Sequence, residues 1–580
     1  MTASNGTVPT TPTPPWPHCG HEAEPDCRGI RVGSHDYCLA HLEEADRSAY
    51  LASLQPGADI DHRGTRFDGV LLAKLLSALT PTADDRAHLG SALFMDAEFE
   101  GDVRFTRAVF NGEARFTEAR FRGDVEFVGA TFKGKTDFSR SEFSNHVNFF
   151  HVEVDGDISF ALARIGGNGI FTKVDISGSA SFHMMEFGGL ASFADARIKG
   201  DTKFHRTNFQ RAPKLGPMSC CGTLDLSEAT FGAAVTIEVA APTVLCRRTR
   251  WAATAALRLR YATVDLSDAV LEYPVIVATH SRPFTLPFTD PPGSEEPELD
   301  RQNPRVQVVS LRGADAAHLL LADIDLTQCL FAGTVHLDQL RLEGLYHLPA
   351  TPSGLRRRGV WPVRWTPRRT LAEEQHWRTA RSTGTDGWTT PAPEGVDVLD
   401  PAALAPVYRQ LRKAFEDGKH EPGAADFYYG EMEMRRHADD IPLGERSVLA
   451  AYWAVSGYGL RASRALGWLL LAMTTTVLLM TLWGLPKDDQ KPETTGKLTD
   501  QRISLTTDTP EAATPDGPLT QRMTPDRFEK SLRVVINSVV FRSSGQGLTT
   551  FGTYTEMASR VTEPVLLGLA ALAIRGRVKR

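Results

Sequence analysis

The chain has 580 residues, 42% of them hydrophobic, and a formal net charge of -7, so it is long enough to form several domains. This mild acidic balance gives no whole-chain signature of a nucleic-acid-binding protein. The seven cysteines are few and odd in number, which argues against a disulfide framework and suits a reducing compartment.

The first segment, residues 1–15, is rich in Thr and Pro. It lacks the basic start and the apolar core of a secretory signal. We therefore expect this segment to be disordered and the N-terminus to stay in the cytoplasm.

Four potential metal ligands follow in segment 16–60, namely Cys19, Cys27, Cys38 and His41. Thiolate and imidazole groups can complete a tetrahedral zinc site, and so small a segment has little core of its own. Seven residues separate the first two cysteines, a longer gap than the usual spacing of about two to four residues. Two interpretations stay open: a structural zinc site without an open catalytic position, or ordinary reduced cysteines.

Segment 61–93 contains five leucines at helical spacing, Leu71, Leu72, Leu75, Leu76 and Leu79. A repeat domain follows directly, and the hydrophobic end of such a domain must be covered. The leucines therefore predict a helix that caps the first repeat.

Large apolar residues recur at alternating intervals of six and five residues from Phe99 to Phe209, which makes ten 11-residue periods. Gly or Asn stands two residues after every second large residue, from Gly101 to Gly200. These residue types tolerate a left-handed backbone, so we expect one such corner in each period. Neither a helix nor a plain strand has a period of 11, whereas short strands that meet at corners do. The pattern predicts a solenoid with two periods in each coil.

The motifs AlaValPheAsnGly at 108–112 and AlaArgPheArgGly at 119–123 closely resemble the pentapeptide-repeat family. Members of that family form right-handed quadrilateral β-helices, so the resemblance implies this fold for residues 94–212. Weaker repeats in 213–348 predict further coils, with a Pro- and Glu-rich loop at 283–302. The expected fold class is therefore a mainly β solenoid with helical caps and a C-terminal α-helical transmembrane module.

Segment 349–399 is rich in Arg and Trp, with three consecutive arginines at 356–358. Such residues suit the interface of an anionic bilayer, and they also suit stacking on single-stranded nucleic acid. A third interpretation is an irregular segment along the solenoid with exposed arginines. We expect no nucleic-acid partner.

Residues 465–485 are 21 consecutive uncharged residues with Trp468 and Trp483 near their ends, which is long enough for a transmembrane helix. Arg461 and Arg464 precede this helix, so the positive-inside rule places the upstream chain in the cytoplasm. We expect juxtamembrane helices over 400–464. The Thr-, Pro- and Asp-rich segment 486–526 is typical of an extracytoplasmic linker.

The last segment, 527–580, combines an amphipathic stretch, a Gly/Thr-rich loop and a marginal second transmembrane helix with a basic tail. This order resembles a two-helix cation-channel subunit, and the resemblance implies a pore-loop-like role for Thr549, Thr550, Phe551, Gly552, Thr553 and Tyr554. Thr555 stands where the channel family needs its second glycine, which argues against potassium selectivity. A degenerate channel-like anchor, a conducting pore and an unrelated hairpin or single-pass anchor stay open.

No phosphate-binding loop, dinucleotide fingerprint, zinc-protease motif or nucleophile elbow occurs in the sequence. Residues 94–211 carry 17 acidic and 15 basic side chains, too balanced for a polyanionic mimic of DNA. We therefore expect a non-catalytic scaffold in the cytoplasm, anchored to the inner (plasma) membrane, with the lipid bilayer and an unknown protein as partners. Homo-oligomerisation stays open. The alternatives are an ion channel or sensor regulated by the solenoid and, more remotely, a membrane-associated oxidoreductase, for which the adjacent thiols Cys220 and Cys221 are the one hint.

Overall fold

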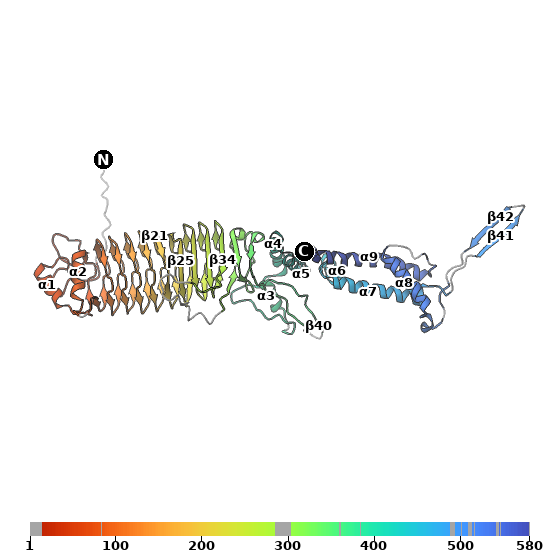
Figure 1. The fold of residues 1–580 in the computed structure, drawn as a ribbon, viewed down its shortest axis with the longest axis horizontal. Coiled ribbons are helices and arrows are strands. Elements are labelled where there is room, and N and C mark those ends of the chain that lie inside the picture. Colours follow the sequence, from red (N-terminus) through yellow and green to blue (C-terminus); the bar gives the residue numbers. More distant parts are fainter. Residues whose placement is uncertain are drawn as a thin grey trace, which may run out of the picture. The chain divides into compact units, whose positions relative to one another are not determined.

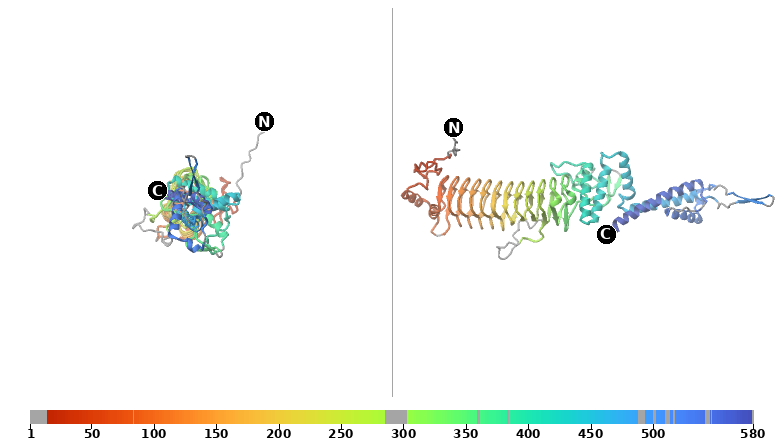
Figure 2. Two further views of the ribbon diagram at one scale, coloured as in Figure 1. Left: turned by 90° about the vertical axis from the view of Figure 1, so that its right-hand side faces the viewer. Right: turned by 90° about the horizontal axis from the view of Figure 1, so that it is seen from above.

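The computed structural model describes residues 14–82, 84–284, 303–358, 361–382, 384–487, 493–499, 502–508, 513–515, 517–540, 545 and 547–578. The chain forms two compact units, Met1–Leu399 and Asp400–Arg580. The first unit is a stack of coils made of short strands, and the second is helical (Figures 1 and 2).

Four short strands make one coil of the solenoid, for example β5 (Glu98–Glu100), β6 (Val103–Arg104), β7 (Val109–Phe110) and β8 (Ala114–Arg115). The next strand, β9 (Arg120–Phe121), pairs in parallel with β5 and so begins the next coil. Repetition of this path builds two 12-stranded sheets and one 14-stranded sheet that run along the stack. The predicted solenoid is confirmed, from β1 (Ile60–Asp61) to β38 (Arg341–Glu343).

The coils stack in a 22-residue register, which places each phenylalanine on its equivalent in the next coil. Phe99 pairs with Phe121, and their rings are stacked with centroids 4.7 Å apart and planes 4° apart. Phe127 lies between two such neighbours, Phe105 at 5.0 Å and Phe149 at 4.9 Å, and is 0% exposed. The core of the solenoid therefore consists of columns of stacked rings, as the spacing predicts.

The prediction that the glycine series forms left-handed corners is wrong beyond Gly101. Left-handed φ angles fall instead on non-glycine residues two positions after a column phenylalanine, such as Arg107 and Glu118. Backbone hydrogen bonds between coils hold these corners, for example from Arg107 N to Val128 O at 2.8 Å. A Cβ atom on Gly123 would lie 2.2 Å from the carbonyl carbon of Gly101 in the preceding coil. Glycine is thus needed at position 123 for the close approach of the two coils.

The residue after several of these glycines uses its side chain to accept a hydrogen bond from the backbone of the next coil. Oδ1 of Asp102 accepts a hydrogen bond from Asp124 N at 3.0 Å, and Oδ1 of Asp124 accepts one from His146 N at 3.1 Å. The ladder continues through Nδ1 of His146, which accepts from Asn168 N at 2.8 Å. These side chains satisfy backbone N–H groups that the strands leave unpaired.

The later coils become shorter, because Phe231 pairs with Trp251 and Trp251 pairs with Leu271, each 20 residues on. The stack then continues across the predicted loop, since Val264 pairs with Val308. Residues 285–302 of that loop lie outside the described residues. The weaker repeats predicted for residues 213–348 are therefore true coils of the solenoid.

At the N-terminal end, α2 (Gly69–Ala78) confirms the predicted cap helix. Asp68 caps it by accepting a hydrogen bond from Leu71 N at 2.6 Å. The helix buries Leu71, Leu72 and Leu75, packs over strands of the first coils and also contacts α1 (Glu44–Ser53).

At the C-terminal end, α3 (Ala372–Ala380) closes the last coil of the described solenoid. Oε1 of Glu373 accepts hydrogen bonds from Phe331 N at 2.5 Å and Ala332 N at 2.9 Å. Burial raises the pKa of this carboxyl group. Glu373 therefore satisfies backbone groups that would otherwise face the open end of the stack.

The Arg/Trp-rich segment packs on itself in the described residues, where several of its arginines contact buried acidic and aromatic side chains. The buried carboxylate of Glu374 pairs with Arg368 at 2.5 Å and with Arg378 at 2.6 Å. The guanidinium of Arg378 lies over the rings of Trp365 and Trp388, about 5 Å from each centroid. The expectation of exposed arginines holds for Arg356 and Arg357 of β39 (Arg356–Arg358), which pairs with β40 (Trp361–Val363).

The second unit consists mainly of helices: α4 (Pro401–Asp417), α5 (Glu421–His437), α6 (Leu443–Ser456), α7 (Ala462–Leu479), α8 (Pro525–Val539) and α9 (Thr550–Val578). A π-helical turn, Met480–Gly484, extends α7. The hairpin β41 (Glu493–Thr499) and β42 (Arg502–Asp508) lies between α7 and α8 in the chain. Among the described residues, two helices are long and apolar enough to span a membrane, Ala462–Gly484 and Thr550–Arg575.

The role of glycine can be tested with Gly123→Ala. We expect this variant to lose about 1–3 kcal/mol of stability, because the new methyl group forces two stacked coils apart. Gly129→Asn is the matched control, since Gly129 has a φ of +66° and 3.5 Å of clearance, and other coils carry non-glycine residues at this corner. Thermal unfolding followed by circular dichroism compares the two; equal losses would contradict the close-approach explanation.

A second prediction concerns His62, which is fully buried beneath Phe94 at the start of a ring column. Burial lowers the pKa of His62 from its ordinary value of 6.5 to about 4. In the unfolded chain His62 therefore binds a proton below pH 6.5, whereas in the folded chain it binds this proton only below about pH 4. Stability should fall by up to about 3 kcal/mol over this range.

His62→Phe should remove much of this acid sensitivity, whereas His146→Gln at an exposed position should keep it. Denaturant unfolding at a series of pH values measures both variants. An unchanged slope between pH 6.5 and 4 in His62→Phe would contradict the assignment.

Candidate functional site

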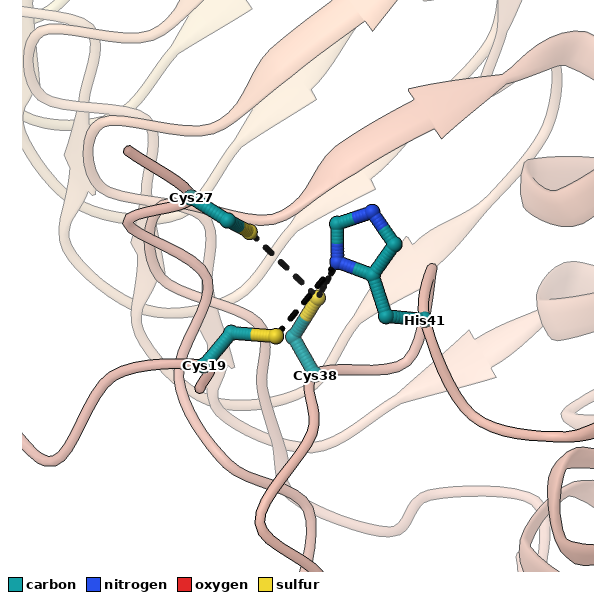
Figure 3. Close-up of side chains that lie close together, drawn as sticks. All are labelled: Cys19, Cys27, Cys38 and His41. Carbon is teal, nitrogen blue, oxygen red and sulfur yellow. Dashed lines mark hydrogen bonds between the residues drawn. The ribbon is translucent and has the colours of Figure 1, made fainter. Parts of the chain in front are cut away.

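The four predicted metal ligands come together near the N-terminal end of the solenoid (Figure 3). Their ligand atoms all lie within 4.8 Å of one another. Nδ1 of His41 is 3.4 Å from Sγ of Cys19 and 3.4 Å from Sγ of Cys38, and the Sγ atoms of Cys27 and Cys38 are 3.8 Å apart. The three cysteines are buried and free of disulfides.

The three individual distances match the edges of a tetrahedral site, whereas the 4.8 Å spread of the whole set is wider than such an edge. Zn–S bonds of about 2.3 Å at tetrahedral angles put two sulfurs about 3.8 Å apart, and a Zn–N bond of about 2.0 Å gives a nitrogen–sulfur edge of about 3.5 Å. The cluster could therefore hold a metal such as zinc. The seven-residue gap after Cys19 is no obstacle, because the intervening loop folds back and Cys19 N donates a hydrogen bond to Gly29 O at 2.7 Å.

Local packing brings Cys38 into the site. A Cβ atom on Gly29 would lie 2.6 Å from Cβ and 2.8 Å from Sγ of Cys38, so this position needs glycine. A turn then brings in His41, whose backbone N–H donates to Cys38 O at 3.0 Å.

The protons of the two closest thiols are shared unequally. The hydrogen bond from Cys38, helped by other contacts, lowers the pKa of Cys27 to about 5. The same contact, together with burial, raises the pKa of Cys38. The geometry thus already favours one thiolate, and a metal ion would displace the remaining thiol proton.

A carboxylate that the sequence analysis missed lies behind the histidine. Oε2 of Glu24 is 3.4 Å from Nε2 of His41 and also pairs with Arg66 of β2 (Arg66–Asp68) at 3.2 Å. Arg66 in turn pairs with Glu98 of the next coil at 3.4 Å. Such a carboxylate fixes the orientation of a ligating histidine, and here it also ties the cluster to the first coils.

The pore-loop-like residues do not form a loop, which corrects that interpretation. Thr550, Phe551, Gly552, Thr553 and Tyr554 form the first turns of α9, and Thr549 directly precedes them. Thr553 N donates to Thr549 O at 2.9 Å, as in a helix. A selectivity filter needs backbone carbonyls that point freely at an ion, and this segment does not provide them.

The glycine of this segment serves helix packing instead. A Cβ atom on Gly552 would lie 2.3 Å from Gly484 O at the end of the π-helical turn. Thr549 strengthens the same crossing, because its Oγ1 donates to Trp483 O at 2.9 Å. The start of α9 is therefore held against the end of the preceding apolar helix.

An arginine that sequence reasoning missed closes the same helix end. This residue is Arg527 of α8. Its guanidinium donates hydrogen bonds to Thr481 O, Leu485 O and Pro486 O at 2.8–3.1 Å. These carbonyls lack partners within the π-helical turn, and a cation at a helix C-terminus is favourable. No helical period in the sequence signals this contact.

Helices α7, α8 and α9 pack together with polar side chains between them. Oγ1 of Thr481 donates to Oγ of Ser531 at 2.9 Å, and Oγ of Ser559 donates to Oγ of Ser538 at 3.0 Å. Oγ1 of Thr476 donates to Oε1 of Glu563 at 3.0 Å. All six side chains are buried.

The outer faces of α7 and α9 are mainly apolar, whereas the outer face of α8 is mixed, because Asp526, Glu529 and Arg533 are exposed there beside apolar side chains. The exposed large side chains are Leu466, Trp468, Leu470, Leu471, Leu478 and Trp483 on the α7 side, Phe528, Leu532, Ile536 and Val540 along α8, and Phe551, Tyr554, Met557, Val561, Val565, Leu567, Leu572 and Ile574 on α9. The solenoid has the opposite arrangement, with its rings inside.

Of the adjacent thiols named in the sequence analysis, Cys220 is not an activated sulfur. Burial raises the pKa of Cys220, whose Sγ lies 3.3 Å from Oγ1 of Thr202. Neither cysteine forms a disulfide bond. A reactive cysteine needs a lowered pKa and access to solvent, so Cys220 does not fit that role.

Residues 85–131 match the family model described as Pentapeptide repeats (9 copies). The comparison with curated proteins gave no match, and the comparison with solved structures gave none either. The matched residues lie in the coils where the phenylalanine columns begin. This part of the solenoid is therefore built from pentapeptide repeats.

Proposed function

We propose that the chain is a non-catalytic scaffold, with its solenoid in the cytoplasm and its C-terminal helices embedded in the inner (plasma) membrane. The solenoid would offer its surface to a protein partner, and the helices would hold it at the bilayer. The inverted polarity of α7 and α9, with apolar side chains outside and polar ones between the helices, supports this proposal most strongly.

In water, a helical unit with buried hydroxyl and carboxyl groups and an outer surface of Leu, Phe and Val would be unfavourable. In a bilayer the same arrangement is favourable, because lipid solvates the apolar exterior and the polar groups bond to one another inside. Helix α9 shows the pattern clearly, since Met557, Val561 and Val565 face outward while Ser559 and Glu563 face inward.

The orientation follows from the flanking charges. Arg461 directly precedes α7 and Arg464 lies in its first turn, while Arg575 and Arg577 lie at the end of α9. The contacts of Thr549 with Trp483 and of Glu563 with Thr476 require α7 and α9 to run in opposite directions. The positive-inside rule then places both basic ends in the cytoplasm and the β41–β42 hairpin outside.

A scaffold role fits the surface of the solenoid, where ion pairs link neighbouring coils. Arg140 pairs with Glu118 at 3.1 Å and Arg164 with Glu186 at 2.6 Å, both across one coil. Among the described residues, the channel-like alternative keeps its order of elements but has lost its filter-like loop to α9. We therefore place the scaffold first and the channel second.

We also propose that the Cys₃His cluster binds structural zinc. The tetrahedral separations and the carboxylate of Glu24 behind His41 support this metal. With four protein ligands the site has no open position for catalysis. Zinc would fasten the N-terminal loops onto the first coils through Glu24 and Arg66.

Zinc binding can be tested on the purified full-length protein. Cys38→Ser should lose bound zinc, whereas Cys246→Ser, at a buried cysteine of the solenoid, should keep one equivalent. Glu24→Gln should keep the stoichiometry but bind about 10–100-fold more weakly. Elemental analysis and chelator competition measure these effects; zinc content unaffected by Cys38→Ser would eliminate the site.

Membrane embedding can be tested with vesicle flotation and accessibility tags. Tags at the N-terminus and after Arg580 should be protected in intact cells, while a tag near Thr507 should be accessible. Leu470→Arg on the exposed face of α7 should reduce recovery in membranes, since a central arginine costs about 2.5–3.5 kcal/mol. Leu162→Arg, at an exposed position of the solenoid, is the matched control. Full recovery of Leu470→Arg, or an accessible C-terminal tag, would contradict the two-helix anchor.

A further inference from the structure

Glu563 is an ionisable side chain buried in the middle of α9. It is 0% exposed, and its Oε1 accepts a hydrogen bond from Oγ1 of Thr476 at 3.0 Å. Its other oxygen, Oε2, is buried and has no hydrogen-bond partner among the residues that the structure describes. Pro564 follows it inside the helix and removes the N–H group that would bond to Arg560 O.

The charged groups around Glu563 do not neutralise it. Helix α7 carries no ionisable residue after Arg464. On α8, Arg527 donates hydrogen bonds to backbone carbonyls. Arg533 of α8 pairs with Glu529 at 2.6 Å on the surface. The other ionisable residues of the elements packed against α9 are Glu556, Arg560 and Arg575 on α9 itself, Asp526 and Lys530 on α8, and Glu445 and Arg446 on α6. Within the described part of the chain, no basic group lies at ion-pair distance from Glu563.

An ionised carboxylate without a cation nearby is unfavourable within a membrane, because the hydrocarbon cannot solvate its charge. A neutral carboxylic acid avoids this cost and places a hydrogen atom on the free oxygen. Oε2 is therefore the natural position for a proton.

Polar or small residues lie on the same face of α9 as Glu563, toward the N-terminus of the helix. Thr549, Glu556 and Ser559 are buried at the helical spacing that ends at Glu563, and Gly552 lies on the same line. Beyond Glu563 the buried positions are Ala570 and Ala573. The face is thus polar toward the N-terminus of α9 and apolar toward its C-terminus.

We propose that Glu563 is a proton-binding site of the membrane module. The ligand is a proton that binds Oε2, the buried oxygen without a hydrogen-bond partner among the described residues. This proposal rests on the proposed membrane embedding of α7 and α9.

A hydrophobic carbodiimide tests the site on the full-length protein in lipid vesicles. The protonated carboxyl group adds across one C=N bond, its proton moves to nitrogen, and the O-acylisourea rearranges to a stable N-acylurea without any redox change. Dicyclohexylcarbodiimide should label Glu563 at mildly acidic pH, and labelling should fall as the pH rises. Peptide mass spectrometry locates the adduct.

Glu563→Gln should abolish this label, whereas Glu529→Gln, at an exposed position of α8, should retain it. Thr476→Val should extend labelling to higher pH, because the lost hydroxyl donor no longer stabilises the ionised form. Thr475→Val is the matched control, since Oγ1 of Thr475 donates to Leu471 O and its side chain is exposed.

Vesicle flotation of the same samples separates the two proposals. A protein that does not float contradicts membrane embedding itself. A protein that floats but leaves Glu563 unlabelled at acidic pH, or labels it equally at all pH values, overturns the proton site alone. Protection of Glu563 by sodium ions at constant pH would also overturn it, because a metal cation would then be the ligand.

Discussion

Hydrogen bonds between the backbones of successive coils hold the first unit together, and the rest of that unit depends on their register. The 22-residue register that pairs Phe99 with Phe121 puts like side chains on like, which creates the ring columns. The same short distance between coils excludes a Cβ atom at Gly123. It also allows side chains such as Asp102 to bond to the next coil, so core, corners and surface all follow from one repeat.

A stack of this kind has two ends whose backbone and apolar groups lack a neighbouring coil. At the N-terminal end, α2 covers the first coils, and the pair Glu24–Arg66 ties the Cys₃His cluster to them. At the C-terminal end, one buried carboxylate, Glu373, accepts from two backbone N–H groups of the last coils. The two ends thus use different chemistry for the same physical need.

In the second unit, polar side chains lie between the helices and many apolar side chains lie outside, which is the reverse of the solenoid. Its helices bury Thr476, Ser538 and Glu563 and expose leucine and phenylalanine, whereas the solenoid buries its phenylalanines and exposes charged pairs. A single chain therefore contains two units with different distributions of polar side chains. Glu563 is a buried carboxylate of the second unit, and its Oε2 has no hydrogen-bond partner among the described residues.

The sequence by itself determined the ring columns, the cap helix, the four potential metal ligands and the two long apolar helices. Each of these features corresponds to a periodic pattern or a short spacing of residues that are close together in the chain. The structure alone decided the roles of Gly123 and Gly552, which allow close backbone contacts instead of a corner and a filter. It also decided that Arg378 lies among tryptophans and that Glu24 stands behind His41. These facts depend on which distant segments meet, and no local period in the sequence records such contacts.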